Sequence, residues 1–255
     1  MKERILTVVG NIAANDGIYK MTLKGDVSCV RAGQFVHISV PSDSRLLRRP
    51  FGVSEYDFEK GTVSVLYAVV GEGTRILSTV KEGTQLACIL GLGNGFPEIS
   101  GAKKIALLGG GMGVVLFPAL AKELAEKGVE ASAYIGFANK NKIICKEEIS
   151  EHAPVKVATD DGSYGIKGYA ADVLKEDIAK GEKFDAVFCC GPEPMFRALQ
   201  KSPLGVPTYI SLEERMGCGV GACLTCSCKI KTADGDKYLR VCKDGPVFPI
   251  EKVVF

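Results

Sequence analysis

Four cysteines near the end of the chain constrain its structure more than any other feature. They follow the spacing Cys218-x4-Cys223-x2-Cys226, and fifteen residues separate the third of them from Cys242. Four thiolates at this spacing are the ligand set of a plant-type 2Fe–2S cluster. The C-terminal segment is therefore expected to fold around a cluster held by these four side chains.

The glycines among these cysteines support the same interpretation. A loop around a cluster turns its amide N–H groups inward, and Gly217, Gly219 and Gly221 permit the backbone angles that this requires. Cys242 is expected to come from a separate strand that closes the cage. Structural zinc is the alternative, although zinc sites more often pair two short cysteine hooks. Cys228, two residues after Cys226, is interpreted as an inert neighbour.

The remaining cysteines have no such pattern and are expected to be small buried hydrophobic residues. They are Cys29, Cys88, Cys145, Cys189 and Cys190. The N-terminus, MKERILTVVG, carries charges where a signal peptide needs an apolar core, so no export signal is expected. We therefore expect a cytoplasmic protein whose ten cysteines are not paired in disulfides.

Charge and hydropathy exclude two classes of partner. Lys and Arg total 32 against 30 Asp and Glu, and the two signs are well mixed, so no basic field for nucleic acid is expected. The longest apolar run, near residues 114–120, is too short to cross a bilayer.

Residues 1–98 have the pattern of a small antiparallel β-barrel. Short segments rich in β-branched residues alternate with turn signals such as Asn15-Asp16-Gly17. The expected strands are Ile5–Val9, Ile18–Leu23, Gln34–Ser39, Thr62–Val70 and Gln85–Leu90. Gly73–Val80 is expected to form one helix. Short strands at this spacing favour a closed barrel.

Residues 99–212 change to alternating strands and helices, which predicts a parallel sheet with helices on both faces. The expected strands are Lys103–Leu108, Glu130–Phe137, Val155–Thr159, Ala186–Cys190 and Thr208–Ser211. The expected helices are Ala119–Lys127, Ala170–Lys175 and Glu193–Leu199. Residues 213–255 then form a third, small domain with a polar hairpin at Lys229–Tyr238. The chain is thus expected to contain three domains.

Two turns at one edge of this sheet are candidates for binding a nicotinamide dinucleotide. Gly109-Gly110-Gly111-Met112-Gly113 follows a strand and opens a helix, where amide groups can hold a pyrophosphate. Cys190-Gly191-Pro192 occupies the equivalent place after a later strand, and ligands bind at that edge of open α/β sheets. The alternative is that these glycines only allow strand and helix to pack closely.

The choice between NAD and NADP stays open at this point. A standard dinucleotide fold places an acidic residue at the end of the second strand, but that strand ends here Gly136-Phe137-Ala138-Asn139. Lys140 and Lys142 lie close to this end and could meet a 2′-phosphate, although surface lysines are usually only solvated.

A second phosphate-binding pattern lies in the barrel. Arg48-Arg49-Pro50-Phe51-Gly52-Val53 places an arginine beside a proline, which favours a rigid grip on phosphate. Leu66-Tyr67-Ala68 lies on a strand, and Gly71-x-Gly73-Thr74 presents amides at a helix start. Tyr67 alone would be interpreted as a core aromatic. Together these residues suit a flavin dinucleotide.

In this order, the three parts resemble the ferredoxin–NADP reductase superfamily. Four stretches narrow the resemblance to the electron-transfer subunits of class 1B, NAD-linked, dihydroorotate dehydrogenases. They are Leu47–Pro50, Val69–Thr74, Leu92–Phe96 and Val241–Phe248. The resemblance covers essentially the whole chain, and the cysteine loop with the C-terminal ending is its most specific part.

The resemblance implies FAD in the barrel, one 2Fe–2S cluster on the four cysteines, and NAD as the nicotinamide cofactor. It implies FAD contacts from Arg49, Pro50, Phe51, Gly52, Leu66, Tyr67, Ala68, Gly73 and Thr74. It also implies a separate FMN-bearing catalytic subunit, with two copies of each chain in a heterotetramer that serves pyrimidine biosynthesis. Gly52 departs from the family, which usually has Ser or Thr there.

The resulting hypothesis is an NAD-linked oxidoreductase subunit that carries electrons between the partner's FMN and NAD+ through the cluster and FAD. No residue of this chain is required to act as an acid or base. One alternative is a reductase component of an oxygenase, transhydrogenase or sulfide dehydrogenase. Another is a metal-bearing nucleotide-binding module without turnover.

Overall fold

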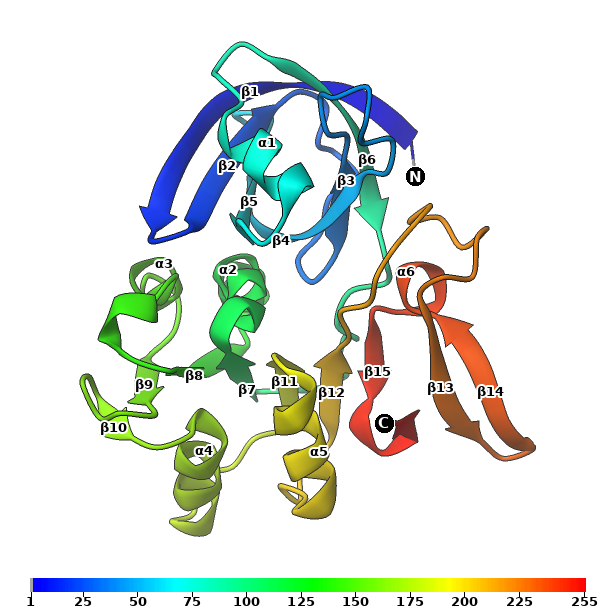
Figure 1. Cartoon of the computed structure of the whole chain (residues 1–255). Helices are drawn as coiled ribbons and strands as arrows, with labels where there is room; N and C mark the ends of the chain where they lie inside the picture. Colours follow the sequence, from blue (N-terminus) through cyan, green and yellow to red (C-terminus); the bar gives the residue numbers. More distant parts are fainter. Residues whose placement is uncertain (1) are drawn as a thin grey trace.

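The computed structural model describes residues 2–255, so only the first residue of the expected 1–98 domain lies outside the described residues. The barrel packs against the edge of the α/β sheet, and the C-terminal hairpin lies beside both (Figure 1). In the chain from residue 2 onward, no helix is long and apolar enough to cross a membrane.

The N-terminal part is a closed antiparallel barrel of six strands in the order β1-β2-β5-β4-β3-β6. The strands are β1 (Lys2–Asn15), β2 (Ile18–Lys24), β3 (Phe35–Ile38), β4 (Arg49–Asp57), β5 (Thr62–Ala68) and β6 (Gln85–Leu92). Alternating residues such as Leu86, Cys88 and Leu90 fill its interior. The sequence indicated five of these strands, and β4 is the sixth.

Helix α1 (Glu72–Ser78) begins directly after the loop that follows β5. The Thr74 hydroxyl accepts hydrogen bonds from the amides of Val70 (3.0 Å) and Gly71 (3.2 Å) and donates to the Gly71 carbonyl (3.0 Å). These bonds fix the loop at the helix start, where a hydroxyl residue is favoured.

The middle part is a seven-stranded sheet in the order β10-β9-β8-β7-β11-β12-β15, parallel except for β15. Its strands are β7 (Lys104–Gly110), β8 (Glu130–Phe137), β9 (Val155–Thr159), β10 (Ile166–Lys167), β11 (Ala186–Cys190), β12 (Thr208–Ser211) and β15 (Val247–Pro249). The helices are η1 (Gly111–Leu116), α2 (Phe117–Glu126), η2 (Lys140–Lys142), α3 (Lys146–Ser150), α4 (Ala170–Ala179) and α5 (Glu193–Lys201).

Successive residues of β7 belong to different cores because strand side chains alternate between faces. Ile105 and Leu107 join the core that contains α2 and α3, whereas Leu108 joins the core that contains α4 and α5. Helices therefore cover both faces of the sheet, as the sequence predicted.

The C-terminal part is a hairpin of β13 (Ser227–Thr232) and β14 (Gly235–Arg240), extended by β16 (Val253–Val254). Helix η3 (Ile250–Lys252) precedes β16. The expectation that Cys242 lies on a separate strand is wrong, since it lies in the one-turn helix α6 (Val241–Asp244). The turn forms because the Asp244 carboxylate accepts from the Arg240 amide (2.8 Å) and guanidinium (2.8 and 3.0 Å), so the chain curls directly after β14.

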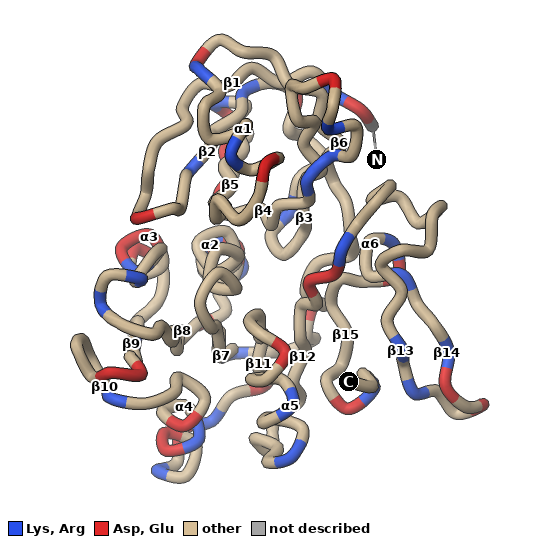
Figure 2. Tube along the Cα trace, viewed as in Figure 1, with Lys and Arg blue, Asp and Glu red and all other residues tan. Residues whose placement is uncertain are grey.

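Lys, Arg, Asp and Glu are interspersed over all three parts of the molecule (Figure 2). Ion pairs between opposite signs are common on its surface, for example Arg48 with Glu3 (2.9 Å) and Lys104 with Glu182 (2.8 Å). The positive and negative charges are therefore mixed over the folded molecule, as the sequence predicted.

Candidate functional site

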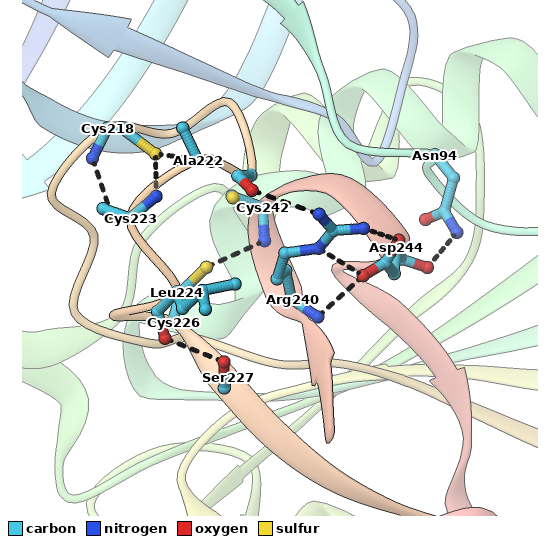
Figure 3. A network of polar contacts seen from close by, with 11 residues as sticks. Asn94, Cys218, Ala222, Cys223, Leu224, Cys226, Ser227, Arg240, Cys242 and Asp244 are labelled. Carbon is cyan, nitrogen blue, oxygen red and sulfur yellow. Dashed lines mark hydrogen bonds and ion pairs between the residues drawn. The ribbon is translucent and has the colours of Figure 1, made fainter. Parts of the chain in front are cut away.

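The loop between β12 and β13 turns its backbone amides toward cysteine sulfur. The Sγ atom of Cys218 accepts from the amides of Val220 (3.4 Å), Ala222 (3.3 Å) and Cys223 (3.4 Å) (Figure 3). Such donors stabilise a thiolate.

Positive φ angles produce this inward turn. They occur at Gly219 (69°), Gly221 (83°) and Leu224 (60°), and glycine adopts this region without steric cost. Gly217 is needed for a different reason: a Cβ there would lie 3.3 Å from the Cys223 sulfur. Gly219 and Gly221 therefore have the role that the sequence predicted, which Leu224 shares, whereas Gly217 does not.

The four predicted ligands are arranged as two pairs. The Cys218 amide lies 3.4 Å from the Cys223 sulfur, and the Cys242 amide lies 3.4 Å from the Cys226 sulfur. Within residues 2–255, no three His, Cys, Asp or Glu side chains gather in a way that would hold a single metal ion. Two cysteine pairs and a ring of amide donors fit a cluster of two irons, each of which takes two thiolates.

The electrostatic surroundings differ between the two pairs. Hydrogen bonds from Thr225, and then from the Cys218 amide, lower the pKa of the exposed Cys223 thiol to about 6. Burial, followed by the neighbouring Cys226, raises the pKa of Cys242 to about 12. The first pair thus lies toward solvent, and the second lies against the hairpin.

An arginine clamp connects the cysteine loop to α6. Arg240 holds the Asp244 carboxylate and also donates to the Gly221 carbonyl (3.1 Å), while the Asn94 amide group donates to the Asp244 carbonyl (3.1 Å) (Figure 3). The Arg240 hydrogen bonds lower the pKa of Asp244. The clamp brings the loop, the fourth cysteine and the barrel end to one place.

Cys228 lies one residue inside β13, opposite Leu239, and is 8% exposed. Burial raises the pKa of its thiol to about 11. Its side chain packs in the hydrophobic core that contains α4 and α5, as a small hydrophobic residue does.

A cavity of about 360 Å³ lies between the barrel and the carboxyl edge of the sheet. It is lined by eight of the nine residues that the resemblance assigned to FAD: Arg49, Pro50, Phe51, Gly52, Leu66, Tyr67, Ala68 and Thr74. The ninth, Gly73, lies against the Arg49 guanidinium, since a Cβ there would be 2.6 Å from its Nε atom. An arginine beside a helix start and an apolar wall are suited to a flavin dinucleotide.

Tyr67 is also part of the barrel's hydrophobic core, which was the alternative interpretation of this residue from the sequence. Its hydroxyl donates to Asn11 (3.0 Å), and the side chain is 2% exposed within the barrel core. Burial raises the pKa of its hydroxyl to about 12. The aromatic ring, rather than the hydroxyl, is therefore what Tyr67 offers to the cavity.

Sequence reasoning missed a group of polar residues on the opposite wall of this cavity. Ser211, Glu213 and Glu214 line it. Cys190, which the sequence assigned to the nicotinamide site, lines this flavin cavity instead. Desolvation, and then Glu213, raises the pKa of Cys190 well above its usual range, and desolvation also raises the pKa of Glu213. Their position could have been predicted from the sequence, because Ser211 ends β12 at the same edge of the sheet as Cys190, and Glu213 and Glu214 follow directly.

A second cavity, of about 620 Å³, extends over the ends of β7, β8 and β9. Gly109, Gly110, Gly111 and Pro192 line it, as expected for a nicotinamide site. Gly113 and Gly191 instead have the packing role: Gly113 abuts the Cys190 carbonyl, and a Cβ on Gly191 would be 3.1 Å from the Gly110 nitrogen. Some glycines of the two turns are thus placed to contact a nicotinamide dinucleotide, and others allow strand and helix to pack closely.

The two cavities share a wall at Met112, which lines both of them. Met216, two residues before the first cluster cysteine, and Pro246, four residues after the last, line the first cavity on its other side. The cysteine loop, the flavin cavity and the nicotinamide cavity therefore lie in series.

This fold, together with the cysteine loop, defines an oxidoreductase of the ferredoxin-reductase type that carries an iron–sulfur domain. Residues 213–254 match the family described as the iron–sulfur cluster binding domain of dihydroorotate dehydrogenase B. The chain is 43% identical to the dihydroorotate dehydrogenase B (NAD+) electron transfer subunit of Bacillus velezensis, over 99% of both chains. It is 42% identical to that of Streptococcus mutans, over 98% of this chain and 97% of the other. The chain belongs to the family of electron transfer subunits of dihydroorotate dehydrogenase B.

Solved structures agree with this placement. An NADH-dependent reduced ferredoxin–NADP oxidoreductase, studied for flavin-based electron bifurcation, superposes with a TM-score of 0.86 at 28% identity, over 98% of this chain and 90% of the other. Phthalate dioxygenase reductase has a TM-score of 0.65 at 17% identity, over 93% of this chain and 76% of that one, and shows the shared fold alone.

Proposed function

We propose that this chain carries electrons between the FMN of a dihydroorotate dehydrogenase catalytic subunit and NAD+, in the biosynthesis of UMP. Cys218, Cys223, Cys226 and Cys242 hold the 2Fe–2S cluster, and the nine barrel residues named above hold FAD. Gly109, Gly110, Gly111 and Pro192 bind NAD in the second cavity, and Gly113 and Gly191 let the two turns pack closely beside it. The single observation that carries the proposal is the serial arrangement of cysteine loop, flavin cavity and nicotinamide cavity, with Met112 between the last two.

The order of sites suits a conversion between one-electron and two-electron chemistry. A bound flavin exchanges a hydride with nicotinamide and single electrons with a cluster, so its place is between them. The residues of this chain bind and orient the cofactors and exclude water from the shared wall. The base that takes a proton from the substrate belongs to the partner.

The assembly and its setting follow from the same proposal. Two copies of this chain and two catalytic subunits form a heterotetramer, which acts in the cytoplasm with reduced thiols. We divide the chain into a FAD domain (1–98), an NAD domain (99–212) and a cluster domain (213–255). The last of these also contributes β15 to the edge of the NAD domain's sheet.

The first experiment is a cofactor assay on anaerobically purified protein. We expect one FAD, two irons and two sulfides per chain, together with NADH-driven reduction of a dye. Zinc without flavin would contradict the proposal. Reconstitution with the FMN-bearing subunit should then give orotate-linked NADH formation. Dye reduction without that coupling would indicate a reductase component of another system.

A further inference from the structure

The nicotinamide cavity is lined by an acidic residue, Asp160, that does not follow the second strand of the domain, where a standard dinucleotide fold has its acid. Strand β8 ends without an acid, yet Asp160, just after β9, lines the cavity together with residues 136–138. The Asp160 amide donates to the Phe137 carbonyl (3.0 Å), and the Asp161 amide donates to the Ala138 carbonyl (3.3 Å). The loop after β9 is therefore tied to the end of β8, and Asp160 takes the place of the missing acid.

The loop that carries Asp160 is fixed on several sides. The Thr159 hydroxyl accepts from the Tyr164 amide (3.1 Å) and donates to the Tyr164 carbonyl (2.7 Å), and the Ser163 hydroxyl accepts from the Lys140 amide (2.8 Å). Asp161 is engaged within the loop, where it accepts from the Ser163 amide (2.9 Å). Of the two adjacent carboxylates, Asp160 is the one that lines the cavity.

We infer that Asp160 accepts hydrogen bonds from the hydroxyls of the adenosine ribose and so selects NAD over NADP. This inference rests on the proposed function. With the pyrophosphate at residues 109–111, the ribose lies toward the neighbouring strands, as in dinucleotide-binding folds generally. A carboxylate there accepts from the free 2′- and 3′-hydroxyls and repels a 2′-phosphate, so attraction and repulsion act in the same direction.

Other charges in the cavity do not reverse this preference. Lys142, Lys175 and Asp172 also line it, so together with Asp160 the wall carries two charges of each sign. Lys142 belongs to η2 and Lys175 to α4, on opposite sides of the β9 loop in sequence. Lys142 is the residue that would favour a 2′-phosphate, so its effect on cofactor choice opposes that of Asp160.

The test compares NADH-driven and NADPH-driven dye reduction by the flavin-loaded and cluster-loaded protein. In Asp160→Asn we expect the ratio of kcat/KM for NADH to that for NADPH to fall at least tenfold, mainly through KM. Asp161→Asn is the matched control, because its carboxylate serves the loop, and its ratio should stay within twofold of the wild type. Lys142→Ala should raise the ratio or leave it unchanged, and an unchanged ratio in Asp160→Asn would overturn the inference.

A binding measurement separates this inference from the proposed function. Calorimetry with ADP-ribose and 2′-phospho-ADP-ribose needs no turnover, and we expect wild type to prefer the first and Asp160→Asn to lose that preference. Wild-type protein that shows the preference but no NADH-driven dye reduction would contradict the proposed function alone. Wild-type protein that binds the 2′-phosphorylated probe more tightly would contradict the role of Asp160.

Discussion

At the scale of single residues, Gly52 is explained by its neighbour. The family resemblance leads us to expect a hydroxyl residue at this position of the flavin motif, but a Cβ on Gly52 would lie 2.5 Å from Cδ2 of Leu116. Leu116 comes from η1 of the NAD domain and lines the same cavity. The side chain of Leu116 thus fills the space that a larger residue at position 52 would need.

Gly52→Ser should therefore weaken FAD binding rather than improve it. We expect loss of about half or more of the bound FAD after gel filtration, because overpacking a filled site commonly costs about 1–3 kcal/mol. The double variant Gly52→Ser with Leu116→Ala should recover FAD content, and Leu116→Ala alone serves as the control. Full FAD content in Gly52→Ser would show that Leu116 moves aside freely.

The two neighbouring cysteines 226 and 228 should differ sharply in their effect on iron content. Cys226→Ser removes the sulfur that accepts from the Cys242 amide, so iron should fall well below two per chain. Cys228→Ser changes a buried thiol on β13 and should leave iron and the cluster absorbance unchanged. If Cys228→Ser lost iron and Cys226→Ser retained it, Cys228 would be the cluster ligand and Cys226 its inert neighbour.

At the scale of elements, local pattern predicted those strands and helices whose residues repeat regularly. It did not predict β4, because Pro50 lacks an N–H and Gly52 lacks a side chain, and pairing with β3 and β5 imposes the strand there. The predicted helix Ala119–Lys127 corresponds to α2, which begins two residues earlier, at Phe117, where Pro118 favours the first turn, and η1 leads into it from the glycine turn.

The features that the sequence did not predict depend on contacts between segments that lie far apart in the chain. Strand β15 has three residues and exists through its pairing with β12, more than thirty residues earlier. Asp160 reaches the end of β8 through a backbone hydrogen bond between adjacent strands. The four cysteines, by contrast, could be proposed as cluster ligands from spacing because three of them lie within one short loop.

A buried polar group links three elements of the NAD domain. The Asp177 carboxylate on α4 accepts from the Tyr134 hydroxyl on β8 (2.6 Å) and from Lys156 on β9 (2.6 Å). Burial opposes ionisation, but the hydrogen bonds from Lys156 and Tyr134 lower the pKa of Asp177. Its contribution to stability is therefore present above its unfolded pKa and is lost as pH falls below about 4.

Asp177→Asn should lower the free energy of unfolding by about 1 kcal/mol at pH 7, since it removes a charged hydrogen bond to a half-exposed lysine. The difference from wild type, measured by urea unfolding, should shrink between pH 5 and pH 3. Glu176→Gln on the same helix removes an exposed ion pair with Lys180 and is the control, with no expected change. A difference that stays constant down to pH 3 would contradict this assignment.

At the scale of the whole molecule, backbone hydrogen bonds hold the cluster domain to the barrel end and to the NAD domain. The Asn94 amide donates to the Gly245 carbonyl (2.8 Å), and the Leu212 amide donates to the Pro246 carbonyl (2.9 Å). Both bonds lie between the flavin cavity and α6, so the cluster ligands are fixed relative to the flavin site. Electron transfer between them then needs no rearrangement of domains.

The outer side of the cysteine loop is the expected contact for the catalytic subunit. Leu224 is 61% exposed and has a φ angle of 60°, which is an unfavourable combination for a leucine. It lies between two cluster ligands, Cys223 and Cys226, where a partner must approach for electrons to pass. We expect this apolar side chain, held there despite its backbone strain, to be buried in the assembled complex.

Leu224→Asn should weaken the complex while leaving the loop intact, because asparagine tolerates a positive φ better than leucine. We expect the Kd for the FMN-bearing subunit to rise about tenfold to a hundredfold, the range set by burying one leucine side chain. Phe58→Asn is the matched control, since Phe58 is similarly exposed (57%) but packs on Tyr56, which contacts α2. Calorimetry with iron counted on the same samples separates docking from cluster loss. If Leu224→Asn binds as wild type and Phe58→Asn does not, the partner docks on the barrel side near α2, and electrons must leave the cluster by another route.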